Sequence, residues 1–171
     1  EAITGPARRR GVVFESEDDD LSPAAENPDP SIERRVFRRD LVAGRTVSIA
    51  RTNLGVAADS DSNDPSISAD GNRIAFTSGA TNLSFSDLAA TQDVYVRDVA
   101  AGTVEFASRA TGSSSAAAGL DSIQPSISDD GTRVAFESRA DELSAADADS
   151  TMDVFARDLA TDVTTLVSRR S

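Results

Sequence analysis

The chain has 171 residues, which is enough for one domain with a hydrophobic core and too few for two of ordinary size. It contains no Cys and no His, and its 17 basic residues are all Arg, which excludes disulfides, thiolate metal sites, a Ser-His-Asp triad and lysine Schiff-base chemistry. A net charge of −12 argues against nucleic acid and anionic membranes as partners, and no apolar run reaches the roughly 20 residues of a membrane span.

Residues 1–54 are predicted to form the first and least regular of three repeated units. They contain the strand-like segments GVVFES at 11–16 and RVFRRD at 35–40. This copy lacks the Pro-Ser-Ile-Ser strand and the Asp-Gly turn that open the other two copies, so its first strand is the least secure element of the pattern. In addition, Arg35 and Arg38 stand where the later copies carry Asp and a small apolar residue.

The second unit, residues 55–112, begins with two short strands. The first strand is PSIS at 65–68, and Asp70-Gly71 then supplies the glycine that a tight hairpin needs for its positive φ. The second strand carries Ile74 and Phe76 at a period of two, which is typical of a β-strand.

Two further strands complete this unit. The third strand has Val94 and Val96 on one side and Tyr95 on the other, and a turn at 100–102 leads to the fourth strand, TVEFAS, at 103–108. Apolar residues therefore fall on both faces of the predicted sheet. This pattern favours a sheet that is sandwiched between neighbouring sheets.

The third unit, residues 113–171, repeats the second. PSISDDGTRVAF at 125–136 matches PSISADGNRIAF at 65–76, and residues 153–170 match residues 93–110. We expect the equivalent aromatic residues of the second and third strands to be buried between sheets: Phe14, Phe76 and Phe136, and Phe37, Tyr95 and Phe155.

The motif Ser-x-Asp-Gly-x-x-x-Ala-Phe-x-Ser, followed by Val-Tyr/Phe-x-Arg-Asp, resembles the repeat of TolB-type β-propellers, which are relatives of the WD repeats. The resemblance covers nearly all of the second and third copies. It implies an all-β fold with three four-stranded antiparallel blades that form a partial β-propeller or arc, in one structural unit.

The short hairpin turns of the predicted blades share one rim, and the long loops between the second and third strands share the opposite rim with the crossovers between units. We call the latter the second rim, and its long loops contain the candidate site. In DADSTMD, the carboxylates of Asp147, Asp149 and Asp153 can converge on one Ca²⁺ ion, a hard cation that prefers oxygen ligands. The segment resembles an Asp-x-Asn-Gly-x-x-Asp loop of similar bacterial propeller repeats, and the second copy keeps Asp87 and Asp93 of this pattern. The alternative is structural: Asp93 and Asp153 cap the loop by accepting backbone N–H bonds before the third strand.

An Arg-Asp pair ends the third strand of every copy. A structural role is favoured, in which the Asp closes the following turn through backbone N–H groups and the Arg spans to a neighbouring acid. The three arginines are Arg39, Arg97 and Arg157, and each is followed directly by its Asp.

These features predict a non-catalytic structural or binding module that acts through self-association or protein–protein contact. An arc of three blades leaves two sheet faces uncovered, so we expect the first copy and the end at Ser171 to contact further blades. Those blades would come from a homo-oligomer or filament, or from the rest of a longer chain.

Two enzymatic alternatives stay open. One is a propeller fragment of a larger hydrolase that gates or positions a separate catalytic domain, although the chain has no Gly-x-Ser-x-Gly elbow. The other is a lyase or lactonase propeller with a central metal, a site that generally draws on His or on inward Glu and Asn. The family resemblance and the Asp loops point to a secreted or cell-envelope protein, and the missing initiator Met indicates a mature product or an excerpt.

Overall fold

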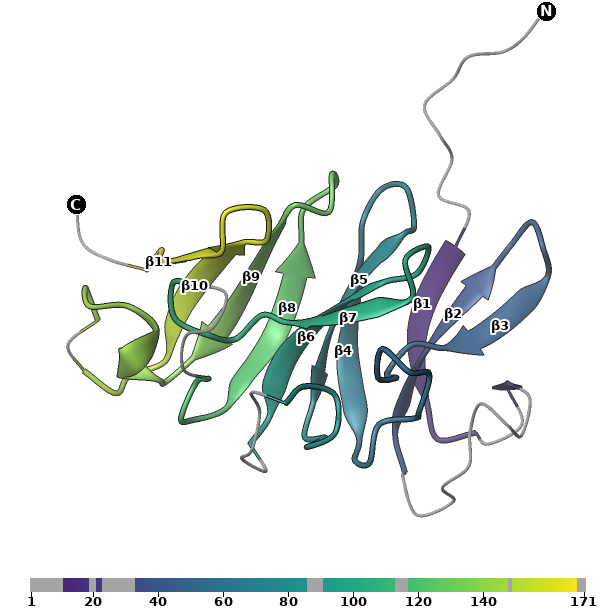
Figure 1. The fold of residues 1–171 in the computed structure, drawn as a ribbon, viewed down its shortest axis with the longest axis horizontal. Coiled ribbons are helices and arrows are strands. Elements are labelled where there is room, and N and C mark those ends of the chain that lie inside the picture. The colour runs from purple at the N-terminus through teal and green to yellow at the C-terminus, as the bar shows by residue number, and fades with distance from the viewer. Residues whose placement is uncertain are drawn as a thin grey trace, which may run out of the picture.

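A computed structural model of the chain describes residues 11–18, 21–22, 33–85, 91–112, 117–147 and 149–168. These residues form three antiparallel β-sheets that lie side by side in chain order, and we call them blades 1, 2 and 3 (Figure 1). Together they make part of a propeller that does not close into a ring. Within the described part of the chain, no helix is long and apolar enough to cross a membrane.

Blade 2 and blade 3 each have the four strands that the sequence predicts. Blade 2 consists of β4 (Ser62–Ile67), β5 (Arg73–Ser78), β6 (Asp93–Asp98) and β7 (Thr103–Phe106). Blade 3 consists of β8 (Ser122–Ile127), β9 (Arg133–Ser138), β10 (Asp153–Asp158) and β11 (Val163–Leu166), with a short 3-10 turn at Asp141–Leu143. In both sheets each strand pairs with its neighbour in the chain.

Blade 1 differs from the expectation of four strands. Its described residues form three: β1 (Gly11–Ser16), β2 (Arg35–Asp40) and β3 (Arg45–Ser48). The sequence reason is the missing Pro-Ser-Ile-Ser segment and Asp-Gly turn. Residues 1–10, where a fourth strand would have to lie, fall outside the described residues.

The first strands of blades 2 and 3 begin three residues earlier than the Pro-Ser-Ile-Ser pattern predicts, because each contains a bulge. The register shifts between Asn63 and Ser66, and between Ile123 and Ser126. Asp64 and Gln124, directly before each proline, have positive φ angles of 50° and 53°. A bulge lets proline sit in a strand, since the ring has no N–H to donate to the ladder. The Asp-Gly turns behave as predicted: Gly71 has φ of 76° and Gly131 of 70°.

The aromatic residues follow one register in all three blades. Phe14 pairs with Phe37, Phe76 with Tyr95 and Phe136 with Phe155, with ring centroids 5.8, 5.8 and 5.9 Å apart. The prediction that these rings are buried is confirmed for every one except Phe14, which is half-buried. Phe37, which stacks on Phe14 on the same face of blade 1, is fully buried.

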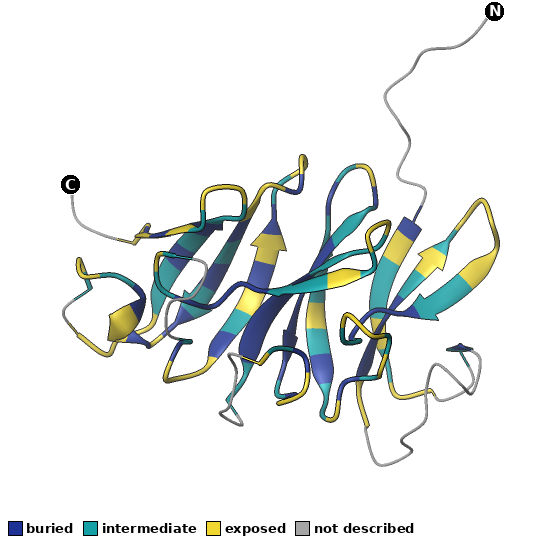
Figure 2. Cartoon of the chain, in the orientation of Figure 1, coloured by how far each residue is buried: buried dark blue, intermediate teal, exposed yellow. Residues whose placement is uncertain are grey.

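Two hydrophobic cores lie between the blades. One joins blades 1 and 2 and includes Val36, Ile74 and Phe76; the other joins blades 2 and 3 and includes Val94 and Phe136. The two faces of blade 2 therefore serve different cores, as its two-sided apolar pattern predicts. Figure 2 shows the consequence: buried residues dominate the central strands β5 and β6, whereas exposed residues are frequent in the outer strands and at the turns.

Candidate functional site

The candidate Asp loop connects β9 to β10, at the rim opposite the short hairpin turns (Figure 1). Each of its three acids offers a carboxylate oxygen that lies within 4.8 Å of the others: Asp147, Asp149 and Asp153. Asp147 and Asp153 are half-buried and Asp149 is exposed. The spacing of the three residues in the sequence thus does bring their side chains together, as predicted.

Local hydrogen bonds hold this loop in shape. The backbone N–H of Asp149 donates to Asp147 Oδ1 over 3.3 Å, and the backbone N–H and hydroxyl of Thr151 both donate to Asp149 Oδ1, over 2.9 and 2.5 Å. The bonds from the Thr151 hydroxyl and then its backbone N–H lower the pKa of Asp149 from its ordinary value. Asp149 therefore stays ionised at neutral pH, which a cation ligand requires.

One oxygen of the cluster lacks a partner. Among the described residues, Asp147 Oδ2 is buried and has no hydrogen bond. Burying such an acceptor without a partner is unfavourable. An oxygen-preferring cation at the cluster would satisfy it, so the donor set fits a Ca²⁺ ion that completes its coordination with water or main-chain oxygens.

The equivalent acid of blade 2 has a structural role. Asp93 is fully buried, and its carboxylate accepts hydrogen bonds from the hydroxyls of Thr91 over 3.0 Å and Ser108 over 2.7 Å. Ser108 in turn accepts the backbone N–H of Val94 over 2.9 Å. This arrangement, which we call the Asp-Ser clip, ties the start of the third strand to the end of the fourth. Asp87, the other predicted ligand of blade 2, lies outside the described residues.

Blade 3 repeats the clip with Asp153 and Ser168, and Thr151 also donates to Asp153, over 3.3 Å. Asp93 and Asp153 were predicted to accept backbone N–H bonds directly. Instead, each accepts a serine hydroxyl, which itself accepts the backbone N–H of Val94 or Val154. In blade 1 both ends of the clip are replaced together: Arg35 stands for the Asp and Ala50 for the Ser. This paired replacement was visible in the sequence, but its meaning depends on a contact between strands.

The acids at the ends of the third strands close the following turns, as predicted. Asp40 Oδ1 accepts the N–H groups of Val42 and Ala43, both over 2.9 Å, and Asp98 Oδ1 accepts that of Ala101 over 2.9 Å. Asp158 Oδ1 accepts two N–H groups in the same way. Backbone hydrogen bonds are the largest cause that lowers the pKa of each of these three acids.

The arginines beside them make a contact that the sequence did not predict. Arg97 donates to the backbone carbonyls of Arg51 and Thr52, over 3.0 and 3.4 Å. Those carbonyls belong to the crossover that leads from β3 to β4. Among bonds between described residues, Arg157 alone of the three makes the predicted contact with a neighbouring acid, Asp162, over 2.7 Å.

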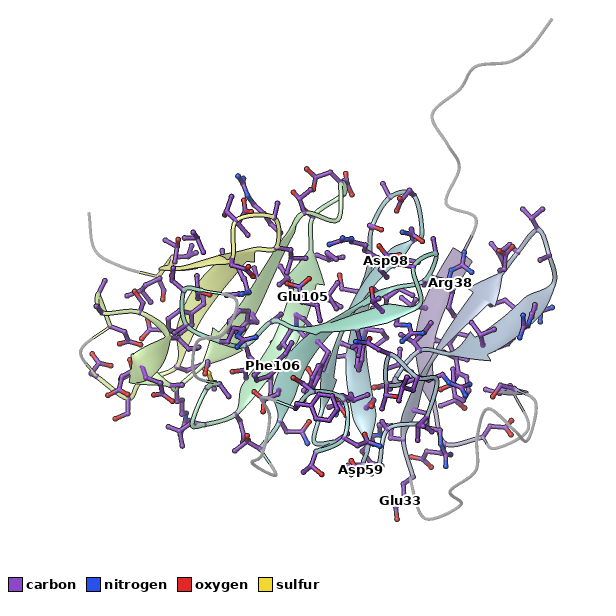
Figure 3. All side chains as sticks on the ribbon, viewed as in Figure 1. Glu33, Arg38, Asp59, Asp98, Glu105 and Phe106 are labelled. Carbon is purple, nitrogen blue, oxygen red and sulfur yellow. The ribbon has the colours of Figure 1, made fainter. Side chains whose placement is uncertain are left out.

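Arg38 of blade 1 also bridges two blades. It stands where Val96 stands in blade 2, and its Nε donates to the carbonyl of Gly71 in the Asp-Gly turn of blade 2, over 3.1 Å. Arg73 of blade 2 reaches the carbonyl of Gly131 in blade 3 over 3.5 Å. In Figure 3, Arg38 and Asp98 lie toward the hairpin rim, whereas Glu33 and Asp59 lie at the opposite rim.

An apolar groove at the second rim was missed by sequence reasoning. Its volume is about 360 Å³, and its apolar lining comes from Leu54, Val56, Leu83, Phe85 and Val104. Leu54 and Phe85 have almost fully exposed side chains. The equivalent positions carry small residues, Gly112 for Leu54 and Ala145 for Phe85, so the repeat pattern gave no signal for this groove.

Comparison with known proteins places the fold. No family model matches the chain, and no curated protein matches it in sequence. Among solved structures, the chain is similar to TolB from Acinetobacter baumannii, with a TM-score of 0.54 and 17% identity over 95% of this chain and 30% of that one. It is also similar to a putative TolB from Agrobacterium tumefaciens, with a TM-score of 0.52 and 14% identity over 92% of this chain and 44% of that one. The chain thus has a TolB-like β-propeller fold and spans less than half the length of these two structures.

Proposed function

We propose that this chain is a non-catalytic structural and binding module whose blades act by associating with further blades. The observation that carries the proposal is that equivalent apolar positions are fully covered in blade 2 and only partly covered in blade 3. Val94 and Val96 of blade 2 are 0% and 2% exposed against blade 3. Their equivalents Val154 and Ala156 are only half-buried, and Val167 is 54% exposed.

Blade 1 supports the same conclusion on its opposite face. Val12 is 47% exposed, whereas its equivalents Ile74 and Val134 are fully buried. This face is therefore partly exposed, although Phe37 on it is fully buried. Covering a few hundred Å² of apolar surface is worth about 25 cal/mol per Å², so each bare face favours contact with another sheet. The covering sheet would come from a second copy of the chain or from further blades of a longer protein.

The test is the association state of the 171-residue chain, measured by light scattering and sedimentation at micromolar concentration. We expect the wild-type chain to form oligomers or filaments. Ala156→Asp, which places a charge on the bare face of blade 3, should stay folded and become monomeric. Val42→Asp adds the same charge at an exposed hairpin and should associate like the wild type. A folded, cooperative wild-type monomer would contradict the proposal.

The hydrolase alternative lacks its sequence signal in this chain, which has no Gly-x-Ser-x-Gly elbow. The module could still position a catalytic domain of a larger protein, and association through the bare faces would then be intramolecular. Adding the flanking segments of the open reading frame to the chain distinguishes the two situations. If they abolish self-association and supply a hydrolase domain, the alternative replaces our proposal.

We also propose that Asp147, Asp149 and Asp153 bind Ca²⁺. The supporting observations are the convergent carboxylates and the unpartnered Oδ2 of Asp147. Ca²⁺ at a hundred times its dissociation constant would stabilise the fold by about 2.7 kcal/mol. A chelator should therefore lower the melting temperature of the wild type but not that of Asp149→Ala, with Asp64→Asn as a charge-matched control. Identical melts in chelator and in millimolar Ca²⁺ would refute this site.

A Ca²⁺-loaded loop suits a compartment rich in that ion, and we place the protein in the cell envelope or outside the cell on this ground. Fractionation of the producing cells, with detection by an antibody against the chain, tests the location. Recovery in the cytoplasmic fraction alone would contradict it.

A further inference from the structure

The crossover segments that connect consecutive blades make the same contacts at both internal junctions. In both internal junctions the crossover runs past the arginine at the end of the next blade's third strand. Arg97 binds the carbonyls of Arg51 and Thr52 in the first junction. In the second, Arg157 is 1% exposed and binds the carbonyls of Arg109 and Ala110, over 3.5 and 3.1 Å.

A second contact accompanies each arginine. Asn53 Oδ1 accepts the backbone N–H of Val104 over 2.6 Å, and Thr111 Oγ1 accepts that of Thr164 over 3.1 Å. Val104 and Thr164 belong to β7 and β11, the outer edge strands of blades 2 and 3. A side-chain oxygen of the crossover thus covers an edge N–H that has no partner within its own sheet.

Blade 1 has the same two donors, and no crossover among the described residues binds them. Arg39 is paired with Thr46 in the register that joins Arg97 to Val104 and Arg157 to Thr164. Arg39 is exposed, and its partner among the described residues is the hydroxyl of Thr46, over 3.2 Å. The equivalent guanidinium binds crossover carbonyls in blades 2 and 3, where Arg97 is half-buried and Arg157 is buried, and Arg39 is available to bind carbonyls in the same way.

The sequence contains a segment that could bind to Arg39 and the edge of β3 in the way the crossovers bind to blades 2 and 3. The residues that follow the fourth strand begin with Ile49-Ala50-Arg51-Thr52-Asn53 in blade 1 and Ala107-Ser108-Arg109-Ala110-Thr111 in blade 2. After blade 3 the same positions are Val167-Ser168-Arg169-Arg170-Ser171. The position that accepts the edge N–H is Asn53, Thr111 and Ser171 in turn, and each of these has a side-chain oxygen. Residues 167–171 thus have the same kinds of acceptor groups that bind the equivalents of Arg39 and the Thr46 N–H in blades 2 and 3.

We infer that Arg39 and the outer edge of β3 bind residues 167–171 of a second copy of the chain. This inference rests on the proposed association and specifies its contact. Arg39 takes the main-chain carbonyls of Arg169 and Arg170, and the N–H of Thr46 donates to Ser171. The half-buried outer face of blade 3 then lies against the face of blade 1 that carries Val12 and Phe14, with Val154 and Ala156 in the positions that Val94 and Val96 occupy in the internal junction. The contact is head-to-tail, so it closes a ring or extends a filament.

Cysteine cross-linking tests the contact directly, because the chain has no Cys of its own. A chain with Thr46→Cys and Ser171→Cys should form a ladder of disulfide-linked oligomers under mild oxidation, since a disulfide needs Cα atoms about 4.4–6.8 Å apart. Thr46→Cys with Ala160→Cys carries the same number of thiols but places the second at a hairpin tip, and should form no ladder.

Two arginine variants complete the test. Arg39→Ala should weaken association roughly tenfold, because bonds from a charged donor are lost. Arg45→Ala removes the same charge from β3 on the side that faces blade 2, and should associate like the wild type. If the wild type associates without a Thr46–Ser171 ladder and Arg39→Ala equals Arg45→Ala, this inference is wrong and the proposed association stands. If the wild type is monomeric, both are wrong.

Discussion

Blades 2 and 3 have nearly the same sequence, yet their equivalent surfaces have different environments. The face of blade 2 that carries Ala75, Val94 and Val96 is sealed by blade 3. The face of blade 3 that carries Ala135, Val154 and Ala156 is only half-buried. The same residue types at the same strand positions are therefore core in one blade and surface in the next. Burial in a repeat is a property of the junction, not of the repeat unit.

The comparison predicts a large difference between two phenylalanines at equivalent positions. Phe136 is 1% exposed in the junction of blades 2 and 3, and Phe136→Ala should cost about 3–5 kcal/mol of unfolding free energy. Phe14 is half-buried on the bare side of blade 1, and Phe14→Ala should cost less than half as much. Urea titrations at submicromolar protein, where association is minimal, measure both. Equal losses would mean that the junction does not determine the cost.

The arginines should differ in the same direction. Arg157→Ala should destabilise the chain by about 2–3 kcal/mol, because it removes charged hydrogen bonds and leaves buried carbonyls unsatisfied. Arg39→Ala should change the stability of the monomer by no more than about 0.5 kcal/mol, since the side chain is exposed. The same titrations apply. A loss of 2 kcal/mol or more for Arg39→Ala, on the order of that for Arg157→Ala, would show that its crossover site is already filled within one chain.

The Asp130-Gly131 turn, in which Asp130 is exposed, gives a smaller, pH-dependent effect on stability. Hydrogen bonds from the Ser128 hydroxyl, and then from Thr132, lower the pKa of Asp130 to about 2. A lowered folded-state pKa means that the stabilisation is present above the unfolded value and is lost as the pH falls through about 2. Asp130→Asn should therefore melt below the wild type at pH 7, and the gap should narrow below pH 4.

Melting curves from pH 7 to pH 2 measure this gap. Asp64→Asn is the control, since it removes one exposed carboxylate and asparagine tolerates the positive φ at that position. A gap that does not change with pH would mean that the Asp130 carboxylate is not the stabilising group.

The smallest effect concerns Glu105, which faces blade 3 from β7. Burial is the largest cause that raises its pKa, and the positive charge of Arg157 opposes the shift. Because the folded-state pKa is raised, the ionised form is disfavoured by folding, and stability falls as the pH rises through that pKa. Glu105→Gln should match the wild type in acid and exceed it slightly at pH 7.

Thermal melts at pH 3 and pH 7 check the prediction for Glu105. Thr165, the equivalent residue on the bare face of blade 3, is exposed, and Thr165→Glu should leave stability unchanged at both pH values. A Glu105→Gln variant that is less stable than the wild type at pH 7 would mean that the attraction to Arg157 outweighs burial.

Local sequence signals predicted most of the fold. Alternation of apolar residues located β5, β6, β9 and β10, and Asp-Gly located the tight turns, because both signals depend on residues close in the chain. The bulges at Asp64 and Gln124 were missed, since the residue at this position differs between the two copies and neither copy has the Gly that marks a positive φ most clearly. The spacing of the acids also predicted that the carboxylates of Asp147, Asp149 and Asp153 converge, and the cation remains a prediction.

The contacts between blades were not predictable in the same way. The Asp-Ser clip joins Asp93 to Ser108 across two strands, so neither residue marks the other in the sequence. The arginines were expected to bind acids, but Arg97 binds backbone carbonyls. Every residue has a main-chain carbonyl, so the sequence does not indicate which carbonyls an arginine binds. The contact between Arg97 and the crossover was therefore seen only in the structure.

The pairing of each strand with its chain neighbour has a consequence for biosynthesis. Every sheet is complete once its own consecutive strands have been made, and no strand waits for a distant partner. The chain can therefore fold vectorially as it leaves the ribosome, each finished blade acting as the template on which the next one settles. Such short-range topology shortens the time during which unpaired strand edges are exposed to other nascent chains.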